Sequence, residues 1–206
     1  RLLRGGGDGL VLEEQHMVLQ QGKTVPVWGK AAPGEDVTVS FAGQRARAKA
    51  CSAGRWKVEL KPLKAGVTGE LTIAGKDNTL KYADVLVGEV WIGSGQSNMQ
   101  WDVQNSNNAE AEVKAANYPQ VRLFSVERSV AGEPQYDCKG QWTVCSPETI
   151  PGFSAVLYFF GRDLHRELKR PVGLINTSWG GTPAESWASR RGLEAVPELK
   201  SILDFW

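Results

Sequence analysis

Hydrophobic and polar residues alternate along the first part of the chain, and this pattern changes near residue 85. Between Val18 and Asp84 the hydrophobic residues fall at every second position in short segments, which Gly, Asn, Asp and Pro separate. The segments span residues 25–31, 36–42, 45–50, 55–60, 69–75 and 79–85. Such alternation, repeated about every ten residues with turn formers between, is typical of half-buried strands in an antiparallel sheet. Residues 1–84 are therefore predicted to form an antiparallel β-sandwich.

The second part of the chain has a different pattern. Residues 85–93, VLVGEVWIG, form an almost continuous apolar run, which is typical of a strand buried on both faces. Further apolar strands are predicted at 121–126 and from residue 171, and helices at 109–118 and 153–170. Strands that alternate with helices indicate parallel βαβ units. Residues 85–206 are therefore predicted to form a three-layer α/β domain with a parallel sheet. With about three core strands it is short for that class, so we expect the N-terminal part of a larger domain.

A small polar turn, SGQSNM, follows the apolar run and displays Ser97 at the end of a predicted buried strand. In open α/β sheets, ligands bind in the crevice beyond the carboxyl ends of the strands. A serine in this place is better suited to chemistry than to packing. The alternative is that Ser97 only caps the helix that follows, which is a common role of serine.

Composition excludes several classes of function. The 206 residues contain 24 Lys and Arg against 23 Asp and Glu, with no basic stripe, so neither nucleic acid nor an anionic membrane is expected as a partner. No run of about eighteen apolar residues is present to span a membrane. Only two histidines accompany the three cysteines, and no metal-ligand spacing recurs, so no metal site is predicted.

The cysteines leave two alternatives. Cys138 and Cys145 flank the hexapeptide KGQWTV and could close a small disulfide loop if the chain is exported, which would leave Cys51 unpaired. Otherwise all three residues are free thiols.

Three segments jointly resemble one enzyme family: GEVWIGSGQSNMQW, FSAVLYFFGRDLHREL and PVGLINTSWGGTPAESW. Together they are similar to the sialate O-acetylesterases, a branch of the SGNH-hydrolase superfamily of serine esterases. The segment from Met17 resembles the β-rich region that precedes the catalytic domain of that family. The resemblance implies an SGNH-type fold and the removal of O-acetyl groups from sialic acid, or from a related glycan such as acetylated xylan. It implies an acyl-enzyme intermediate, no cofactor, and a secreted, periplasmic or lysosomal location.

The resemblance assigns roles to individual residues. Ser97 matches the family nucleophile, and its own N–H would help to bind the oxyanion. Gly181, and after it Gly180, would give a second oxyanion donor, because a glycine lets the backbone approach a reacting centre closely. Both glycines could instead be ordinary turn residues. The neighbours Gln96 and Asn98 would hold the loop or touch substrate, and Glu185 would orient the site or form an ion pair.

The sequence also departs from the family pattern. A serine esterase needs a histidine base, which an aspartate usually orients, but the Asp-x-x-His block of the family is absent, as is its Trp-Tyr-Gln-Gly-Glu-like segment. The two histidines fit poorly: His16 precedes the β-rich region, and His165 lies on a predicted helix beside Asp163 and Arg166. We therefore expect an N-terminal esterase portion that carries the nucleophile, lacks its His and Asp, and has a C-terminal esterase segment as its partner.

A different class of function also fits the pattern. The chain could be a non-catalytic carbohydrate-binding module whose strand tryptophans, Trp28 and Trp56, stack on a sugar. A single tryptophan on a strand is more often part of the core.

Overall fold

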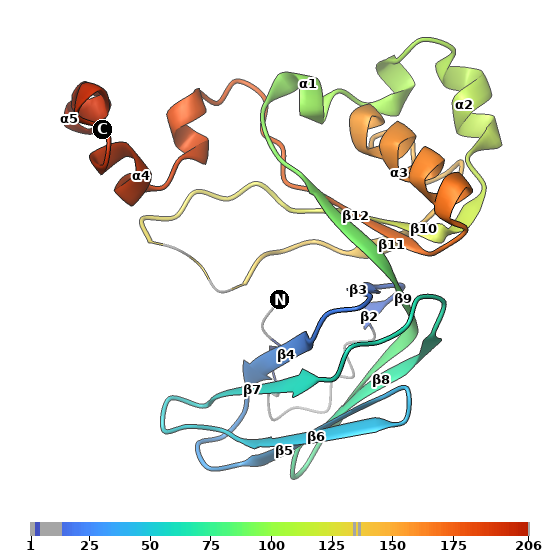
Figure 1. Cartoon of the computed structure of the whole chain (residues 1–206), viewed down its shortest axis with the longest axis vertical. Coiled ribbons are helices and arrows are strands. Elements are labelled where there is room, and N and C mark those ends of the chain that lie inside the picture. Colours follow the sequence, from blue (N-terminus) through green and yellow to red (C-terminus); the bar gives the residue numbers. More distant parts are fainter. Residues whose placement is uncertain (1–2, 5–13, 134, 136, 206) are drawn as a thin grey trace.

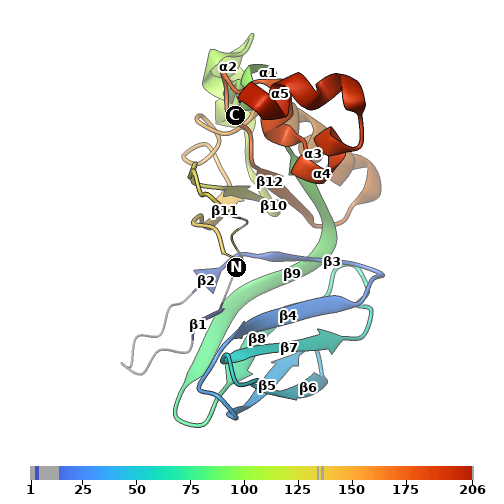
Figure 2. The same cartoon turned by 90° about the vertical axis from the view of Figure 1, so that its left-hand side faces the viewer.

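The structure is a computed structural model that describes residues 3–4, 14–133, 135 and 137–205. A β-rich part lies at one end of the molecule and the helices lie at the other (Figure 1). One strand, β9 (Thr79–Gly93), runs through both parts, as the perpendicular view also shows (Figure 2). The architecture is mixed α/β, as the sequence predicted.

The β-rich part contains the strands predicted from alternation, with ends that differ by at most two residues. They are β4 (Val25–Lys30), β5 (Asp36–Phe41), β6 (Gln44–Lys49), β7 (Arg55–Leu60) and β8 (Thr68–Ala74). Strands β4 and β7 pair antiparallel in one sheet, while β9, β8, β5 and β6 follow one another in the other. Inward side chains of both sheets form one core, to which β4, β5 and β7 each contribute a buried residue at every second position.

The pairing corrects the expectation of a wholly antiparallel sandwich. Two short strands, β2 (Glu14–Gln15) and β3 (Val18–Gln20), pair parallel with β9. A third, β1 (Leu3–Arg4), pairs parallel with β4. Strands of two or three residues are too short for an alternating pattern of hydrophobic and polar residues to reveal them.

Strand β9 changes partners along its 15 residues. Residues 79–86 pair with β8, residues 86–88 pair with β3, and residues 89–93 pair parallel with β12 (Val172–Asn176). The predicted division between residues 84 and 85 therefore falls within one continuous strand. Its pattern changes there because the strand passes from a half-buried position in the sandwich to a position in the parallel sheet.

The helical part is built on three parallel strands: β9, β12 and β10 (Tyr118–Ser125). A fourth strand, β11 (Trp142–Cys145), pairs antiparallel with β10 and was not predicted. Helix α3 (Ala155–Leu168) packs on β12 and β10, and α2 (Ala109–Ala115) lies near it. The helices α4 (Arg190–Glu194) and α5 (Lys200–Phe205) extend away from the sheet (Figure 1). No helix among the described residues is long and apolar enough to cross a membrane.

Helix α3 approaches the sheet closely at two glycines. A Cβ on Gly93 would lie 2.6 Å from the Leu157 side chain, and a Cβ on Gly161 would lie 2.5 Å from that of Leu174. The helix begins at the buried Ser154, whose hydroxyl accepts the Leu157 N–H at 3.3 Å. This close packing fixes the N-terminus of α3 against the end of β9.

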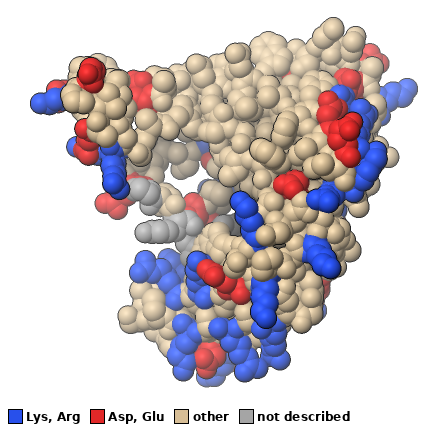
Figure 3. Space-filling view, in the orientation of Figure 1, with Lys and Arg blue, Asp and Glu red and all other residues tan. Residues whose placement is uncertain are grey.

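Charged side chains line the edge strand β6, where they disfavour pairing with the edge strand of another molecule. Arg45, Arg47 and Lys49 alternate with half-buried residues along this edge strand and are all exposed. Lys and Arg side chains gather over the β-rich part, while the helical end is uncharged over its middle and carries both acidic and basic side chains at its two sides in this view (Figure 3).

The three cysteines are free, so the structure contains no bond between Cys138 and Cys145. Cys51 and Cys138 are exposed and Cys145 is buried. Burial raises the pKa of the Cys145 thiol to about 12, which keeps it protonated and unreactive at neutral pH.

An ion-pair cluster fixes β9 at the middle of its length. The Asp84 carboxylate lies 2.7 Å from Nδ1 of His16 and 2.7 Å from Nη1 of Arg122, whose side chain is only 5% exposed. Burial alone would raise the pKa of Asp84, but the hydrogen bonds from Arg122 and His16 outweigh it and hold the pKa below the ordinary value. Asp84 therefore compensates a buried cation of β10.

We predict that Asp84→Asn lowers the free energy of unfolding at pH 7 by about 1–3 kcal/mol, because a buried guanidinium then faces a neutral partner. Since the folded-state pKa of Asp84 is lowered, its contribution is complete above about pH 4 and is lost as the pH falls through the folded-state value. Urea unfolding at pH 7 and pH 3 should show a smaller loss with acid in Asp84→Asn than in wild type. Asp36→Asn, at an exposed ion pair with Lys49, should behave as wild type. Equal effects of the two substitutions would contradict the role of Asp84.

Candidate functional site

Ser97 lies where β9 gives way to a helix. Helix α1 (Ser97–Gln100) begins at this residue, and Gln96 occupies the N-cap position. The Gln96 Oε1 accepts hydrogen bonds from Ser97 N at 3.4 Å and from Ser97 Oγ at 3.2 Å. Ser97 is exposed, so its hydroxyl is open to a ligand. Gln96 holds the loop in this structure. A contact between Gln96 and substrate stays a prediction.

A second loop, residues 177–182, lies against the Ser97 loop. It follows β12, the parallel neighbour of β9, so both loops leave the sheet at the carboxyl ends of adjacent strands. Thr177 N donates to Gly93 O at 2.9 Å, and Trp179 N donates to Gly95 O at 2.9 Å. These two bonds continue the pairing of the strands into the loops and bring the predicted site residues of both segments together.

The two glycines of the second loop differ in their surroundings. A Cβ on Gly180 would lie 3.3 Å from Ser97 Oγ and 2.7 Å from Gln100 Oε1, so any larger residue here would displace these two side chains. Gly180 N donates to Gln100 Oε1 at 2.5 Å. Gly181 is exposed, has a φ of +82°, and has open space where a Cβ would be. The structure therefore brings Gly180 to Ser97 and leaves Gly181 facing outward.

The remaining predicted site residues are less closely connected to Ser97. Asn98 is exposed on α1. Glu185 is half-buried in a short 3-10 helix (Ala184–Trp187) and lines a groove of about 280 Å³ with residues of α4 and α5. None of the contacts of the described residues joins Glu185 to Ser97, so its orienting role stays a prediction.

The Ser97 turn is anchored on helix α3. Ser154, fully buried at the start of α3, donates its hydroxyl to Met99 O at 2.6 Å. Trp101 O accepts the Ala155 N–H at 2.8 Å, and Met99 packs against the core beneath. Three contacts therefore fix α1 from below, and Ser97 is held on a rigid base.

Neither histidine serves Ser97 in this structure. His16 is bound to Asp84, nine residues before the end of β9, which places it roughly 30 Å from the Ser97 turn. His165 lies on α3 about 15 Å along the helix axis from its N-terminus, and its Nδ1 lies 2.7 Å from Arg170 O.

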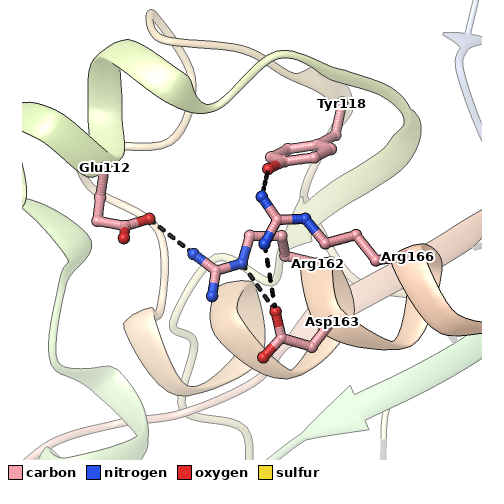
Figure 4. Close-up of polar contacts among 5 residues, drawn as sticks. All are labelled: Glu112, Tyr118, Arg162, Asp163 and Arg166. Carbon is pink, nitrogen blue, oxygen red and sulfur yellow. Dashed lines mark hydrogen bonds and ion pairs between the residues drawn. The ribbon is translucent and has the colours of Figure 1, made fainter.

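Asp163, two residues before His165 in sequence, pairs with two arginines (Figure 4). Its Oδ1 lies 2.9 Å from Arg162 Nε and 3.9 Å from Arg166 Nη1. Arg162 also pairs with Glu112 of α2 at 2.7 Å, and Arg166 donates to the Tyr118 hydroxyl. This network ties α2, α3 and β10 together and leaves Asp163 with a structural role.

Two residues beside the site were not identified from the sequence. Gln100 contacts Gly180, and its position three residues after Ser97 on one helical turn was the available signal. The guanidinium carbon of Arg128 lies 6.0 Å from the centre of the ring of Trp179, which is the residue before Gly180. No local pattern marks Arg128. Over the part of the chain that the structure describes, no group of three or more His, Cys, Asp or Glu side chains could hold a metal ion.

Comparisons with known proteins agree on one family. Residues 87–199 match the family described as carbohydrate esterase, sialic acid-specific acetylesterase. The sialate O-acetylesterase of Rattus norvegicus is 38% identical over 225 residues, which cover 97% of this chain and 42% of the relative. That of Homo sapiens is 39% identical and covers 90% of this chain and 40% of the relative.

A solved structure shows the same fold. A carbohydrate acetylesterase from Xanthomonas citri matches with a TM-score of 0.86 and 36% identity, over 91% of this chain and 43% of that protein. The chain thus spans about two fifths of the length of these relatives.

We predict that Gly93→Ala lowers the free energy of unfolding by about 1–3 kcal/mol, because the added Cβ would lie 2.6 Å from Leu157 beneath the Ser97 turn. The matched control is Gly152→Ala, where a Cβ meets nothing within 4 Å. Urea denaturation measures both variants. Equal stability of Gly93→Ala and wild type would mean that α3 does not pack against β9 this closely.

Proposed function

The chain belongs to the sialic acid-specific acetylesterase family of carbohydrate esterases, and from this we propose that it supplies the nucleophile, Ser97, of a serine esterase that removes O-acetyl groups from sialic acid. One observation supports the proposal above the others. Ser97 is exposed beyond the carboxyl end of β9, and Gly180, from the loop that follows the neighbouring strand β12, lies against its hydroxyl. This is the place where an α/β sheet binds its ligands.

The proposed reaction proceeds in two steps. Ser97 Oγ attacks the acetyl carbonyl while a base takes the hydroxyl proton, and the resulting oxyanion is stabilised by backbone N–H groups of Ser97 and the glycine loop. The carbon–oxygen bond to the sugar then breaks, the sugar oxygen takes the proton, and acetyl-Ser97 remains. Water, deprotonated by the same base, attacks the acetyl group and releases acetate and free Ser97.

We place the base, with its aspartate, in a further esterase segment that packs beside β9 as part of an SGNH-type three-layer domain. Beyond Gly88, no described strand pairs with the edge of β9 that faces away from β12. Large apolar side chains flank this edge: Trp91 is 45% exposed, Ile92 66% and Phe160 of α3 41%. An apolar surface beside an unpaired edge supports an additional strand there.

Sialic acid rather than a neutral glycan is favoured by Arg128. Its guanidinium lies over the ring of Trp179, the residue that precedes Gly180, so a cation lies beside the proposed acetyl site. Arg128 is exposed and thus able to bind the carboxylate of sialic acid, which acetylated xylan lacks. A sugar of this kind also favours a secreted, periplasmic or lysosomal location.

The module hypothesis finds less support. Trp56 is 5% exposed and belongs to the sandwich core, so it has no face free to stack on a sugar. Trp28 is 40% exposed and lines an apolar cavity of about 300 Å³ between the sandwich and the parallel sheet.

Hydrolysis of 4-nitrophenyl acetate tests the nucleophile. With an added C-terminal segment from one of the aligned relatives, Ser97→Ala should lower kcat by roughly three orders of magnitude or more, because the reacting oxygen is removed. Ser94→Ala, in the same exposed turn, should stay close to wild type. The 206-residue chain alone should show no difference between wild type and Ser97→Ala. Activity that persists in Ser97→Ala would refute the proposal.

Binding of sialic acid tests Arg128. Sialic acid should bind roughly five- to tenfold more tightly than its methyl ester, because esterification removes the charge that pairs with the guanidinium. Arg128→Met should abolish this preference and Arg128→Lys should keep part of it. Arg45→Met on β6 is the control. Calorimetry gives the affinities, and an Arg128→Met variant that still prefers the free acid would rule out this role.

A further inference from the structure

We propose that the apolar cavity between the sandwich and the parallel sheet is a second binding site, which takes a small uncharged aromatic molecule. The cavity has a volume of about 300 Å³. Pockets that hold small organic molecules begin at this size and form preferentially where two parts of a protein meet. Neither Ser97 nor the loop of residues 177–182 lines the cavity, so the site is separate from the proposed esterase site.

One wall of the cavity is the face of the parallel sheet that α3 does not cover. Leu174 of β12 faces α3, since a Cβ on Gly161 would lie 2.5 Å from its side chain. Side chains alternate along a strand, so the next residue, Ile175, faces the other way. Ile175 pairs with Phe124, and Phe124 pairs with Trp142. All three line the cavity, and the ring centres of Phe124 and Trp142 lie 5.3 Å apart.

Trp28 belongs to the wall that the sandwich contributes. Val25 and Val27 of β4 are buried, so Trp28 occupies an outward position of this strand and is 40% exposed. Outward positions of antiparallel strands are usually polar, and the sandwich core therefore does not explain a tryptophan here. The cavity does explain it, because Trp28 and the other outward residue, Pro26, both line it.

The lining selects the chemistry of the occupant. None of the described side chains that line the cavity is charged, and its polar groups are the Cys138 thiol, the Tyr82 hydroxyl and the indole N–H groups. An ion would lose its hydration there without gaining an opposite charge, and a sugar would leave most of its hydroxyls without partners. An uncharged ring is favoured instead, because three aromatic side chains offer it edge and face contacts.

The two walls are held at a fixed separation. Strand β9 belongs to both parts of the molecule and contributes Tyr82 to the lining. Val18 of β3 lies close against β12, since a Cβ on Gly173 would be 2.8 Å from the Val18 Cβ. The site is therefore preformed, and a ligand binds without the cost of ordering the two parts.

Indole, a small neutral aromatic molecule, tests the site by NMR titration of the 206-residue chain. Indole should shift the Nε1–H signals of Trp28 and Trp142 and the methyl signals of Ile175, with one saturable Kd of roughly 0.1–1 mM. Indole-3-acetate, which adds a carboxylate, should bind roughly tenfold or more weakly. Methyl galactoside should shift none of these signals. Shifts that do not saturate, or equal affinity for indole and indole-3-acetate, would contradict the proposal.

Two variants place the bound indole. Val126→Trp puts a larger side chain into the lining and should weaken binding roughly tenfold or more. Its control is Val130→Trp, the same change at an 87% exposed position of the same loop, which should bind as wild type. Trp28→Leu removes one aromatic wall and should weaken binding roughly three- to tenfold. If neither Val126→Trp nor Trp28→Leu changes the affinity, indole binds elsewhere and the proposal is wrong.

The cysteines provide an independent readout. Cys138 is exposed and lines the cavity, whereas Cys51 is exposed away from it. Indole at five times its Kd should slow the modification of Cys138 by N-ethylmaleimide by up to roughly sixfold, because the thiol reacts while the cavity is free. Modification of Cys51 should be unchanged. Equal slowing at both cysteines, or at neither, would overturn the site.

Other occupants and the esterase proposal are distinguished by the same titration. If the signals of lining residues move with protein concentration when no indole is present, a second copy of the chain occupies the cavity and the small-molecule site is refuted. Ser97→Ala should bind indole as wild type does. Loss of indole binding in the cavity variants would leave ester hydrolysis by Ser97 as a separate question, so the two proposals can fail independently.

Discussion

The arrangement of this molecule depends on the continuity of β9. A single strand of 15 residues pairs in turn with β8 of the sandwich, with β3 and with β12. The position of the helical part relative to the sandwich is therefore fixed by one continuous backbone. The Asp84 cluster fixes the strand from the side at the buried Arg122, and α3 fixes its end through Gly93. Ser97 follows four residues after that end. The position of Ser97 is therefore set by backbone pairing and core packing, which are the least mobile elements of a protein.

The site is formed because backbone hydrogen bonding between β9 and β12 continues into the loops that follow these two strands. The bonds from Thr177 to Gly93 and from Trp179 to Gly95 extend the β9–β12 register into two loops. Glycine occurs where the loops come closest, because any side chain at position 180 would meet both Ser97 and Gln100. An exposed serine on rigid elements, with the backbone of a neighbouring loop beside it, is the preorganisation that the proposed acyl transfer would require.

The sequence predicted those features that depend on local burial. Alternation located the sandwich strands within two residues, because every second side chain faces a core there. It did not show that residues 79–84 and 85–93 form one strand, since the partners of a strand lie far away in sequence. The contact between Gln100 and Gly180 joins residues 80 apart, and Arg128 meets Trp179 across two loops. Such contacts follow from strand register, which a local pattern does not contain.

The exposed cations of β6 have a consequence for how copies of this protein meet. An edge strand offers free N–H and C=O groups to any similar strand, and inserting a second copy of β6 beside the first would bring Arg45, Arg47 and Lys49 against their own equivalents. Repulsion of this kind prevents open-ended growth of the sheet into fibrils at one end. The edge of β9 that lies beyond Gly88 and faces away from β12 carries tryptophan and isoleucine in place of cations. Aggregation of the unpartnered chain would thus begin at the edge of β9.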